Sequence, residues 1–219
     1  MTVHLRPTAP VAPDALLPGD PGRALALAQE LLEAPKMSNH HRGLWGYYGE
    51  TPAGRPLTIQ STGIGGPSAA VVLSELAQQG VRRAIRIGTG VAASAEVALG
   101  TLLIPPRALG GDGTSRELGF DEVVPGSQVL TAALAEALPR ARAGTVATID
   151  AYYFEGDRIS PEVDAFEMAT APLYAVGMRL GIEVGCVLAV VEAAGERLGE
   201  EELQRAELEM GHAAAAALV

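Results

Sequence analysis

Apolar positions along the chain follow two alternating patterns. Short apolar runs typical of β-strands lie at residues 15–18, 44–49, 57–61, 83–88, 98–104, 144–150 and 183–191. Segments with apolar residues at helical spacing lie between them, at residues 22–33, 67–79, 128–137, 165–180 and 199–217. Strands that alternate with helices are typical of an α/β fold, so we expect a sheet with helices packed against it.

Residues 105–127 interrupt this alternation. The stretch, PPRALGGDGTSRELGFDEVVPGS, is rich in turn residues and has no clear period. Long irregular connections in compact domains often carry function. We therefore expect a long loop close to a site or an interface.

The composition limits the partners of the chain. Its 219 residues, 48% of them hydrophobic, suffice for one well-buried domain over residues 1–219. The formal net charge of -10 and the scattered 16 Lys and Arg residues argue against a nucleic acid partner, which requires a basic surface. The single cysteine, Cys186, lies in the apolar run GCVLAVV and is expected in the core. Since the stretch MTVHLRPTAPVAP has no apolar leader core and no run reaches membrane-spanning length, we expect a soluble, cytoplasmic protein without a membrane partner.

A turn-rich stretch, LLPGDPGRA at residues 16–24, connects the first strand to the first helix. Pro21 is suitably placed for a helix start, so the stretch is consistent with an ordinary tight corner. It is also consistent with an anion site, because the free amides and the dipole at a helix N-terminus favour negative charge, and Arg23 lies one turn later. Both interpretations stay open on this stretch alone.

Two more small-residue loops follow strands. STGIGGPS at residues 61–68 precedes a helix; Pro67 and Ser68 suit its first turn and cap, and the glycines let a ligand approach the backbone. In RIGTG at residues 86–90, Arg86 stands at the tip of an apolar strand, where an arginine requires an anionic partner. That partner is either a bound anion or a surface carboxylate.

The stretches LPGDPGRA, STGIGGPS and RIGTG, in this order and at this spacing, resemble the nucleoside phosphorylase family of the hexameric type, which includes purine nucleoside phosphorylases and uridine phosphorylases. The resemblance continues through NHHRGLWGYYG, TIDAYYFEGD, FEMATAPLYA and LAVVEAAG and covers nearly the whole chain. It implies a single three-layer α/β/α domain with a mixed central sheet. It also implies a homohexamer, assembled as a trimer of dimers, that acts in nucleoside metabolism and purine salvage.

The resemblance also implies roles for individual residues. The implied phosphate ligands are Gly19, Arg23, Arg86, Thr89 and, from a neighbouring subunit, Arg42. The implied nucleoside contacts are His4, also lent to a neighbour, together with Tyr152, Glu167 and Met168. On residue type alone, Tyr152 is equally consistent with an ordinary half-buried core residue.

Cleavage of a purine nucleoside needs a general acid at N7, because the purine leaves poorly as an anion. The family uses an Asp for this, backed by an Arg farther along the chain. Glu192 and Arg205 stand at the matching positions. The structural alternative is that Glu192 merely ends a buried strand and that Arg205 pairs with Glu201 or Glu209 on its own helix.

Three residues depart from the family pattern. Ala169 replaces a Glu that accepts hydrogen bonds from the ribose hydroxyls, and loss of such a bond costs about 1.5–3 kcal/mol. Val91 stands where the family has a glycine, and Pro172 is expected to interrupt the helix that follows. These departures imply a compensating group, a different sugar, or weak catalysis.

We therefore expect a pentosyltransferase that uses phosphate as co-substrate to release the base, preferably a purine, and needs no metal or organic cofactor. His4, His40, His41 and His212 show no metal-ligand spacing. Three alternatives stay open. A uridine phosphorylase is disfavoured because the compact segment AYYFEGD lacks the insert that binds uracil in those enzymes, and a nucleosidase that uses water is disfavoured by Arg23 and Arg86. A weakly active or non-catalytic nucleoside-binding relative is favoured by Ala169.

Overall fold

A computed structural model describes residues 2–153 and 162–219. Within these residues the strands are β1 (Asp14–Pro18), β2 (Glu33–Asn39), β3 (Gly46–Glu50), β4 (Pro56–Gln60), β5 (Arg83–Ala92), β6 (Leu102–Ile104), β7 (Arg107–Gly110), β8 (Val123–Pro125), β9 (Arg142–Ala143), β10 (Val146–Thr148), β11 (Ala165–Glu167), β12 (Glu183–Ala193) and β13 (Glu196–Arg197). The helices are α1 (Pro21–Leu31), α2 (Gly66–Gln78), α3 (Gly113–Glu117), α4 (Gln128–Ala137), α5 (Thr170–Leu180) and α6 (Glu200–Ala217), with a 3-10 turn η1 (His41–Gly43). The expected α/β fold is confirmed.

The strands form one mixed sheet with its branch point at β5. Its main path runs β2-β3-β4-β1-β5-β11-β10-β7-β8, and β12 pairs with β5, β6 and β13. β1 and β12 run parallel to β5, whereas β11 pairs antiparallel with the last residues of β5, Phe166 opposite Val91. β1 therefore ends beside Ile87, and β11 and β12 flank the last residues of β5, at the carboxyl edge where open α/β sheets commonly place their ligands.

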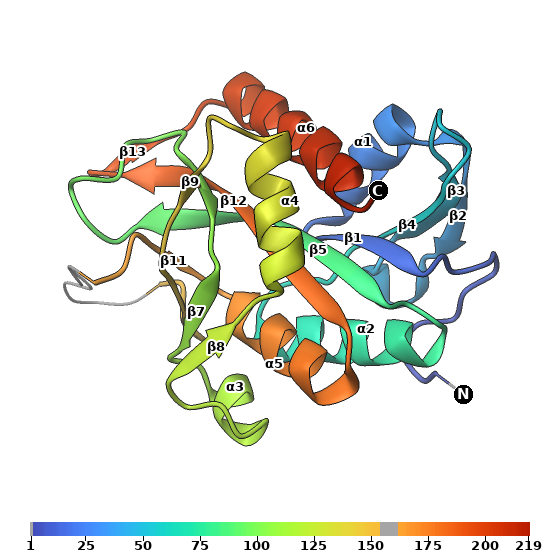
Figure 1. Cartoon of the computed structure of the whole chain (residues 1–219), viewed down its shortest axis with the longest axis horizontal. Coiled ribbons are helices and arrows are strands. Elements are labelled where there is room, and N and C mark those ends of the chain that lie inside the picture. Colours follow the sequence, from blue (N-terminus) through green and yellow to red (C-terminus); the bar gives the residue numbers. More distant parts are fainter. Residues whose placement is uncertain (1, 154–161) are drawn as a thin grey trace.

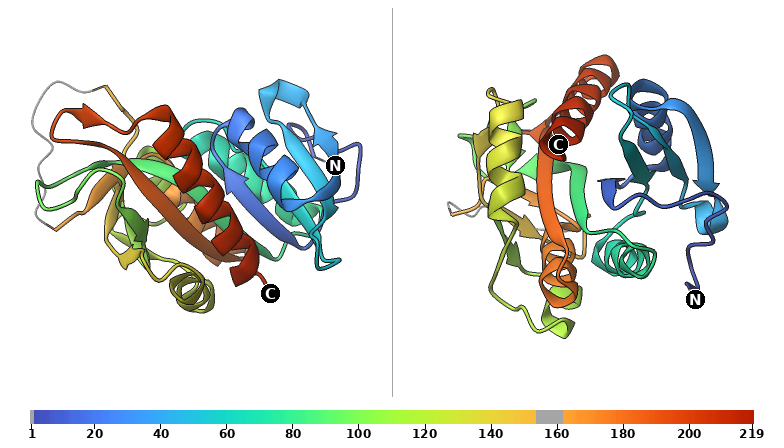
Figure 2. Two further views of the ribbon diagram at one scale, coloured as in Figure 1. Left: turned by 90° about the horizontal axis from the view of Figure 1, so that it is seen from above. Right: turned by 45° about the vertical axis from the view of Figure 1, so that its right-hand side comes forward.

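Helices cover both faces of the sheet. Figure 1 shows α1, α4 and α6 on one side and α2, α3 and α5 on the other, and the view on the right of Figure 2 separates α6 from α2 and α5 in the same way. Neighbouring strand residues divide between two apolar clusters: Leu16 packs with α1 and α6, and Leu17 packs with α2 and α5. This alternation is the two-residue period of a strand buried on both faces. The result is the three-layer arrangement.

The prediction of a long loop at residues 105–127 is wrong. The stretch contains β7, α3 and β8, and β7 pairs antiparallel with β8 and parallel with β10. The Asp112 side chain caps α3 by accepting a hydrogen bond of 2.8 Å from the Ser115 amide. Elements of three to five residues are too short to show a period, so their turn residues dominate the sequence pattern.

Other boundaries also differ from the sequence patterns. The helix expected at 165–180 begins at Thr170, because residues 165–167 form β11. Pro172 lies in the first turn of α5, where no intrahelical amide bond is lost, so it does not interrupt the helix. The helix expected at 22–33 ends at Leu31, and β2 begins two residues later. The hairpin strand β13 was not predicted.

Cys186 is buried in β12, as expected. Burial raises the pKa of its thiol to about 12, so the thiol stays protonated and unreactive at neutral pH. Within residues 2–153 and 162–219, no helix combines the length and apolar character needed to cross a bilayer.

Candidate active site

A cavity of about 700 Å³ opens at the carboxyl end of β5. Residues from the β1–α1 corner, the loop that precedes α2, the end of β5, β11 and the end of β12 line it. Of the eleven site residues that the resemblance implies, eight line this cavity: Gly19, Arg23, Arg86, Thr89, Tyr152, Glu167, Met168 and Glu192. His4, Arg42 and Arg205 are not among its lining residues.

The β1–α1 corner brings Arg23 to the cavity. Asp20 caps α1 and accepts a hydrogen bond of 2.8 Å from the Arg23 amide, and Pro21 opens the helix. The Gly63 amide donates to the Gly19 carbonyl oxygen at 3.0 Å, which ties this corner to the loop before α2. The two small-residue loops therefore form one wall of the cavity.

The expectation that Ser68 caps α2 is wrong. The N-cap residue of α2 is Gly65, with no side-chain cap bond, and the Ser68 hydroxyl donates to the Thr62 carbonyl oxygen at 2.6 Å. Gly63 and Gly65 both have positive φ, of 73° and 85°, a conformation that favours glycine. The hydrogen bond from Ser68 thus fixes the conformation of the loop, and Gly63 and Gly65 line the cavity.

Arg86 lies inside β5 and is largely buried, with 6% of its surface exposed. Its Nη2 lies 3.1 Å from Glu167 Oε2, so its partner is a buried carboxylate rather than the surface carboxylate considered from the sequence. Among the described residues its Nε has no hydrogen-bond partner. Since this Nε is buried, Arg86 offers an anion in the cavity mainly the positive charge of its guanidinium group.

Gly88 makes room for this arginine. A Cβ at Gly88 would lie 3.0 Å from Arg86 Cζ and Nε and 2.5 Å from Leu188 Cδ2. Any side chain there would therefore push the guanidinium group or Leu188 out of place. Gly88, the first glycine of RIGTG, is thus needed for the observed position of Arg86 on the same strand.

Glu167 is committed to neighbouring groups. Its Oε1 accepts hydrogen bonds from Thr148 Oγ1 at 2.5 Å and from the Thr170 amide at 2.8 Å. Its Oε2 accepts from the Ala169 amide at 2.8 Å, in addition to the contact with Arg86. Glu167 therefore holds Arg86 and the start of α5, and any bond to a ligand would share oxygens that are already engaged.

At the other end of the cavity, Glu192 contacts two donors. Its Oε2 accepts from the Tyr152 hydroxyl at 3.1 Å and from Arg197 Nε at 3.0 Å. Burial, followed by the hydrogen bond to Glu192, raises the pKa of Tyr152. Arg205 lies on an exposed part of α6 instead, so the structure brings Glu192 to Arg197 and not to the arginine named from the sequence.

Sequence reasoning missed Arg197, although the motif EAAGER contained a signal. Ala194 and Gly195 both have positive φ, of 51° and 81°, and form the two-residue turn of the β12–β13 hairpin. The register of this hairpin sets Glu192 opposite Arg197. Two residues with such a turn between them are cross-strand neighbours, which a short hairpin pattern can predict.

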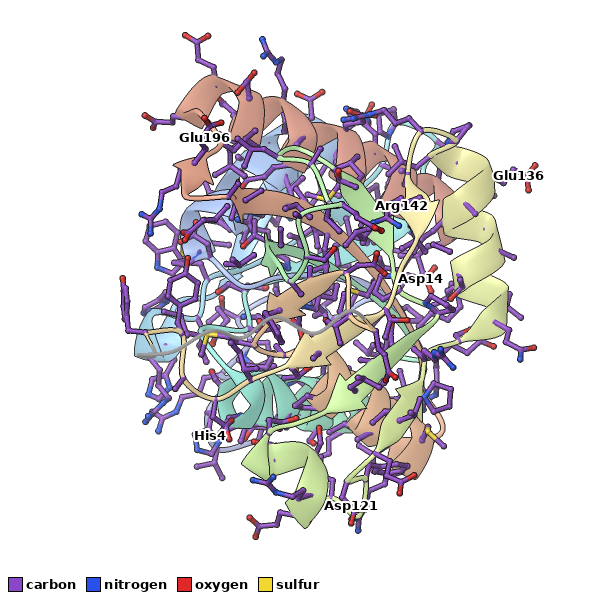
Figure 3. The ribbon with its side chains drawn as sticks, turned by 90° about the vertical axis from the view of Figure 1, so that its left-hand side faces the viewer. His4, Asp14, Asp121, Glu136, Arg142 and Glu196 are labelled. Atoms are coloured by element: carbon purple, nitrogen blue, oxygen red, sulfur yellow. The ribbon has the colours of Figure 1, made fainter. Side chains whose placement is uncertain are left out.

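The N-terminal arm is fastened away from the cavity. Glu75 of α2 accepts from the amides of Val3, His4 and Leu5 and contacts His4 Nδ1 at 2.8 Å. Burial raises the pKa of Glu75, but the bonds from the arm outweigh this and lower it to about 2. Glu196 of β13 marks the end of the cavity that holds Glu192, because β13 pairs with that end of β12. Figure 3 shows His4 well separated from Glu196.

Arg42 lies beside this arm. His41 Nδ1 is 2.9 Å from the His4 carbonyl oxygen, so the arm and η1 form one surface. Arg42 itself is exposed and has φ of 60° and ψ of 19°, a left-handed conformation that costs a non-glycine residue about 1–3 kcal/mol. The two residues that the sequence assigned to a neighbour's site are therefore presented together, outside the cavity of their own chain.

Comparisons with known proteins agree with this geometry. The sequence model of a family described as the phosphorylase superfamily matches residues 13–219. Proteins named purine nucleoside phosphorylase DeoD-type from Bacillus cereus (strain ZK / E33L) and Bacillus thuringiensis (strain Al Hakam) are each 33% identical to this chain over 224 residues, covering 93% of both sequences. The match extends over the segments that form the cavity.

Proposed function

Because the chain belongs to the phosphorylase superfamily, we propose that it cleaves the N-glycosidic bond of a purine nucleoside with phosphate, giving free base and pentose 1-phosphate. The observation that carries this proposal is the presence of Arg23 and the buried Arg86 in one cavity. Arginine binds phosphate oxygens in pairs, which suits both residues to this role. The relatives named above carry the same activity in their names.

The cavity supplies a division of roles. Gly19, Arg23, Arg86 and Thr89 bind phosphate at one end, where it stabilises and then captures the sugar cation that forms at C1′. Met168 and Tyr152 contact the sugar and the base. Glu192 protonates or hydrogen-bonds the leaving purine, and Tyr152 and Arg197 hold its carboxyl group in place.

A nucleoside panel assayed with and without phosphate tests this function. Release of free base only when phosphate is present is the expected result, with purine nucleosides the better substrates. Release that does not depend on phosphate would identify a nucleosidase, and a preference for uridine would identify a uridine phosphorylase. Binding without release on any substrate would identify a non-catalytic relative.

The site is composite in this proposal, with Arg42 and His4 supplied by a neighbouring subunit of a hexamer. Within one chain, both cavity arginines are already neutralised, Arg23 by Glu207 and Arg86 by Glu167. A doubly charged phosphate therefore enters a site without net positive charge, and a further cation is needed to stabilise it. The exposed, strained Arg42 is suited to supply that cation across an interface.

A mixing experiment tests the shared site. We expect Arg42→Ala and Arg86→Ala to be nearly inactive alone, because each variant lacks one cation at every site. Co-expressed, they should recover a substantial part of the parent activity, since each mixed dimer contains one site with both cations. A stable monomer in light scattering, or no recovery in confirmed mixed oligomers, would contradict the shared site.

The wall of the cavity at Ala169 predicts weak binding of ordinary ribonucleosides. Ala169 and Met168 offer no side-chain acceptor there, and the oxygens of Glu167 are engaged. Ala169→Glu is expected to lower the KM for inosine or adenosine, because a carboxylate would accept bonds from the sugar hydroxyls. Steady-state kinetics with ribo- and 2′-deoxyribonucleosides measures this. An unchanged or raised KM would show that the pocket has been remodelled for a different sugar.

A further inference from the structure

A buried ion pair links the cavity to the last helix. Arg23 Nε donates to Glu207 Oε1 at 2.6 Å, and Arg23 Nη2 lies 2.6 Å from the same oxygen. The two side chains are 10% and 15% exposed. Arg23 lines the cavity and Glu207 does not, so the carboxylate lies behind the arginine as seen from the cavity.

The five N–H donors of Arg23 can be accounted for one by one. Nε and one hydrogen of Nη2 face Glu207, and Nη1 donates to the Ile87 carbonyl oxygen at 3.3 Å. Two donors then have no partner among the described residues, one on each terminal nitrogen. These two nitrogens form the end of the guanidinium fork, which binds two oxygens of one anion.

We propose that Glu207 is a positioning residue for phosphate, which holds one edge of Arg23 so that the two donors at the end of its guanidinium group are directed into the cavity. This inference rests on the proposed function, since it requires phosphate as the ligand of Arg23. An arginine side chain has many rotamers. If one of them is fixed in advance, Arg23 loses less conformational entropy when the anion binds. Glu207 also keeps the charge of a largely buried arginine compensated when the site is empty.

No other residue of the charged face of α6 makes this contact. Glu209, two residues along, forms an ion pair with Arg140 at the surface, with 39% of its side chain exposed. It differs from Glu207 in pairing with an arginine outside the cavity. Glu209 therefore offers a matched control on the same helix.

The test compares Glu207→Ala, Glu207→Gln and Glu209→Ala by steady-state kinetics, with inorganic phosphate and the nucleoside varied separately. We expect Glu207→Ala to raise the KM for phosphate about tenfold or more, because Arg23 loses the carboxylate that fixes its orientation. The KM for the nucleoside should change far less. Glu207→Gln keeps an oxygen acceptor, so its KM for phosphate should stay within about threefold of the parent value. Glu209→Ala should have the same KM for phosphate as the parent.

A double variant separates positioning from a general loss of stability. If Glu207 acts through Arg23, Arg23→Ala with Glu207→Ala should have the same KM for phosphate as Arg23→Ala alone. If Glu207→Ala does not fold, the phosphate-induced rise in Tm of Glu207→Gln is compared with that of Glu207→Asp, whose shorter side chain should reduce the rise. Equal KM values for phosphate in Glu207→Ala and the parent, or equal rises in the two conservative variants, would overturn the inference. Parent enzyme that releases base without any need for phosphate would instead overturn the proposed function.

Discussion

Arg86→Ala is expected to abolish the stabilisation of the protein by phosphate. A ligand that binds only the folded state stabilises it by mass action, by about 2.7 kcal/mol at a hundred times its Kd. For a chain of this size such a gain corresponds to a rise in Tm of roughly 5–10 °C. Arg86 is one of the two arginines that line the cavity, so its removal takes away one of the two cations that an anion there would contact. Activity should be lost with it.

The substitution also affects the protein without phosphate. Glu167 would lose its buried cation and keep only hydrogen bonds, and breaking a buried ion pair costs about 3–5 kcal/mol. The relevant measurement is therefore the difference in Tm with and without phosphate, taken for each variant separately. A lower starting Tm alone does not bear on the assignment.

Arg83→Ala provides the matched control. Arg83 lies on the same strand, three residues before Arg86, and pairs with Asp14 at 2.6 Å outside the cavity. Its removal should lower the Tm but leave the phosphate response intact. If Arg86→Ala responds to phosphate as strongly as the parent and Arg83→Ala, phosphate is bound elsewhere.

The end of the cavity that holds Gly19, Arg23 and Arg86 could be predicted from the sequence because its geometry is local. In LPGDPGRA, the corner, the helix cap and Arg23 lie within eight consecutive residues, and in RIGTG the glycine that makes room for Arg86 is two residues away. Turn residues and helix starts depend on backbone preferences that are visible in a short stretch. The bounds of α4 matched the helical spacing for the same reason.

The partners of these arginines could not be predicted. Glu207 is 184 residues from Arg23, and it reaches that arginine only because α6 packs beside α1. Glu167 lines the cavity, but its ion pair with Arg86 could not be predicted, because it depends on the docking of β11 against the end of β5. Such pairs depend on how helices and strands dock, and neither apolar periodicity nor local spacing encodes that orientation.

Arg205 and Arg197 illustrate the same limit at the other end of the cavity. The family resemblance implied Arg205, yet the two-residue turn folds β13 back so that Arg197 contacts Glu192. Arg205 follows farther along, on an exposed part of α6. A substitution of the acid, by contrast, tests Glu192 whichever arginine supports it.

Glu192→Gln is expected to reduce turnover of a purine nucleoside by roughly 10²–10⁴-fold, the range that loss of a general acid typically costs. Glutamine keeps the length of the side chain and an oxygen that can accept from Tyr152 and Arg197, so the architecture of this end of the cavity should survive. It cannot transfer a proton to the base.

A 7-methylated purine nucleoside separates acid catalysis from support of the site. Its base already carries a positive charge and leaves without a proton, so Glu192→Gln should cost far less on this substrate than on inosine. Single-turnover rates on both substrates measure the chemical step itself. Equal losses on the two would show that Glu192 positions the base, with Tyr152 and Arg197, without acting as the acid. Unchanged rates on both would leave Glu192 as the residue that closes the β12–β13 hairpin, since its pairing with Arg197 joins the two strands whether or not a nucleoside is bound.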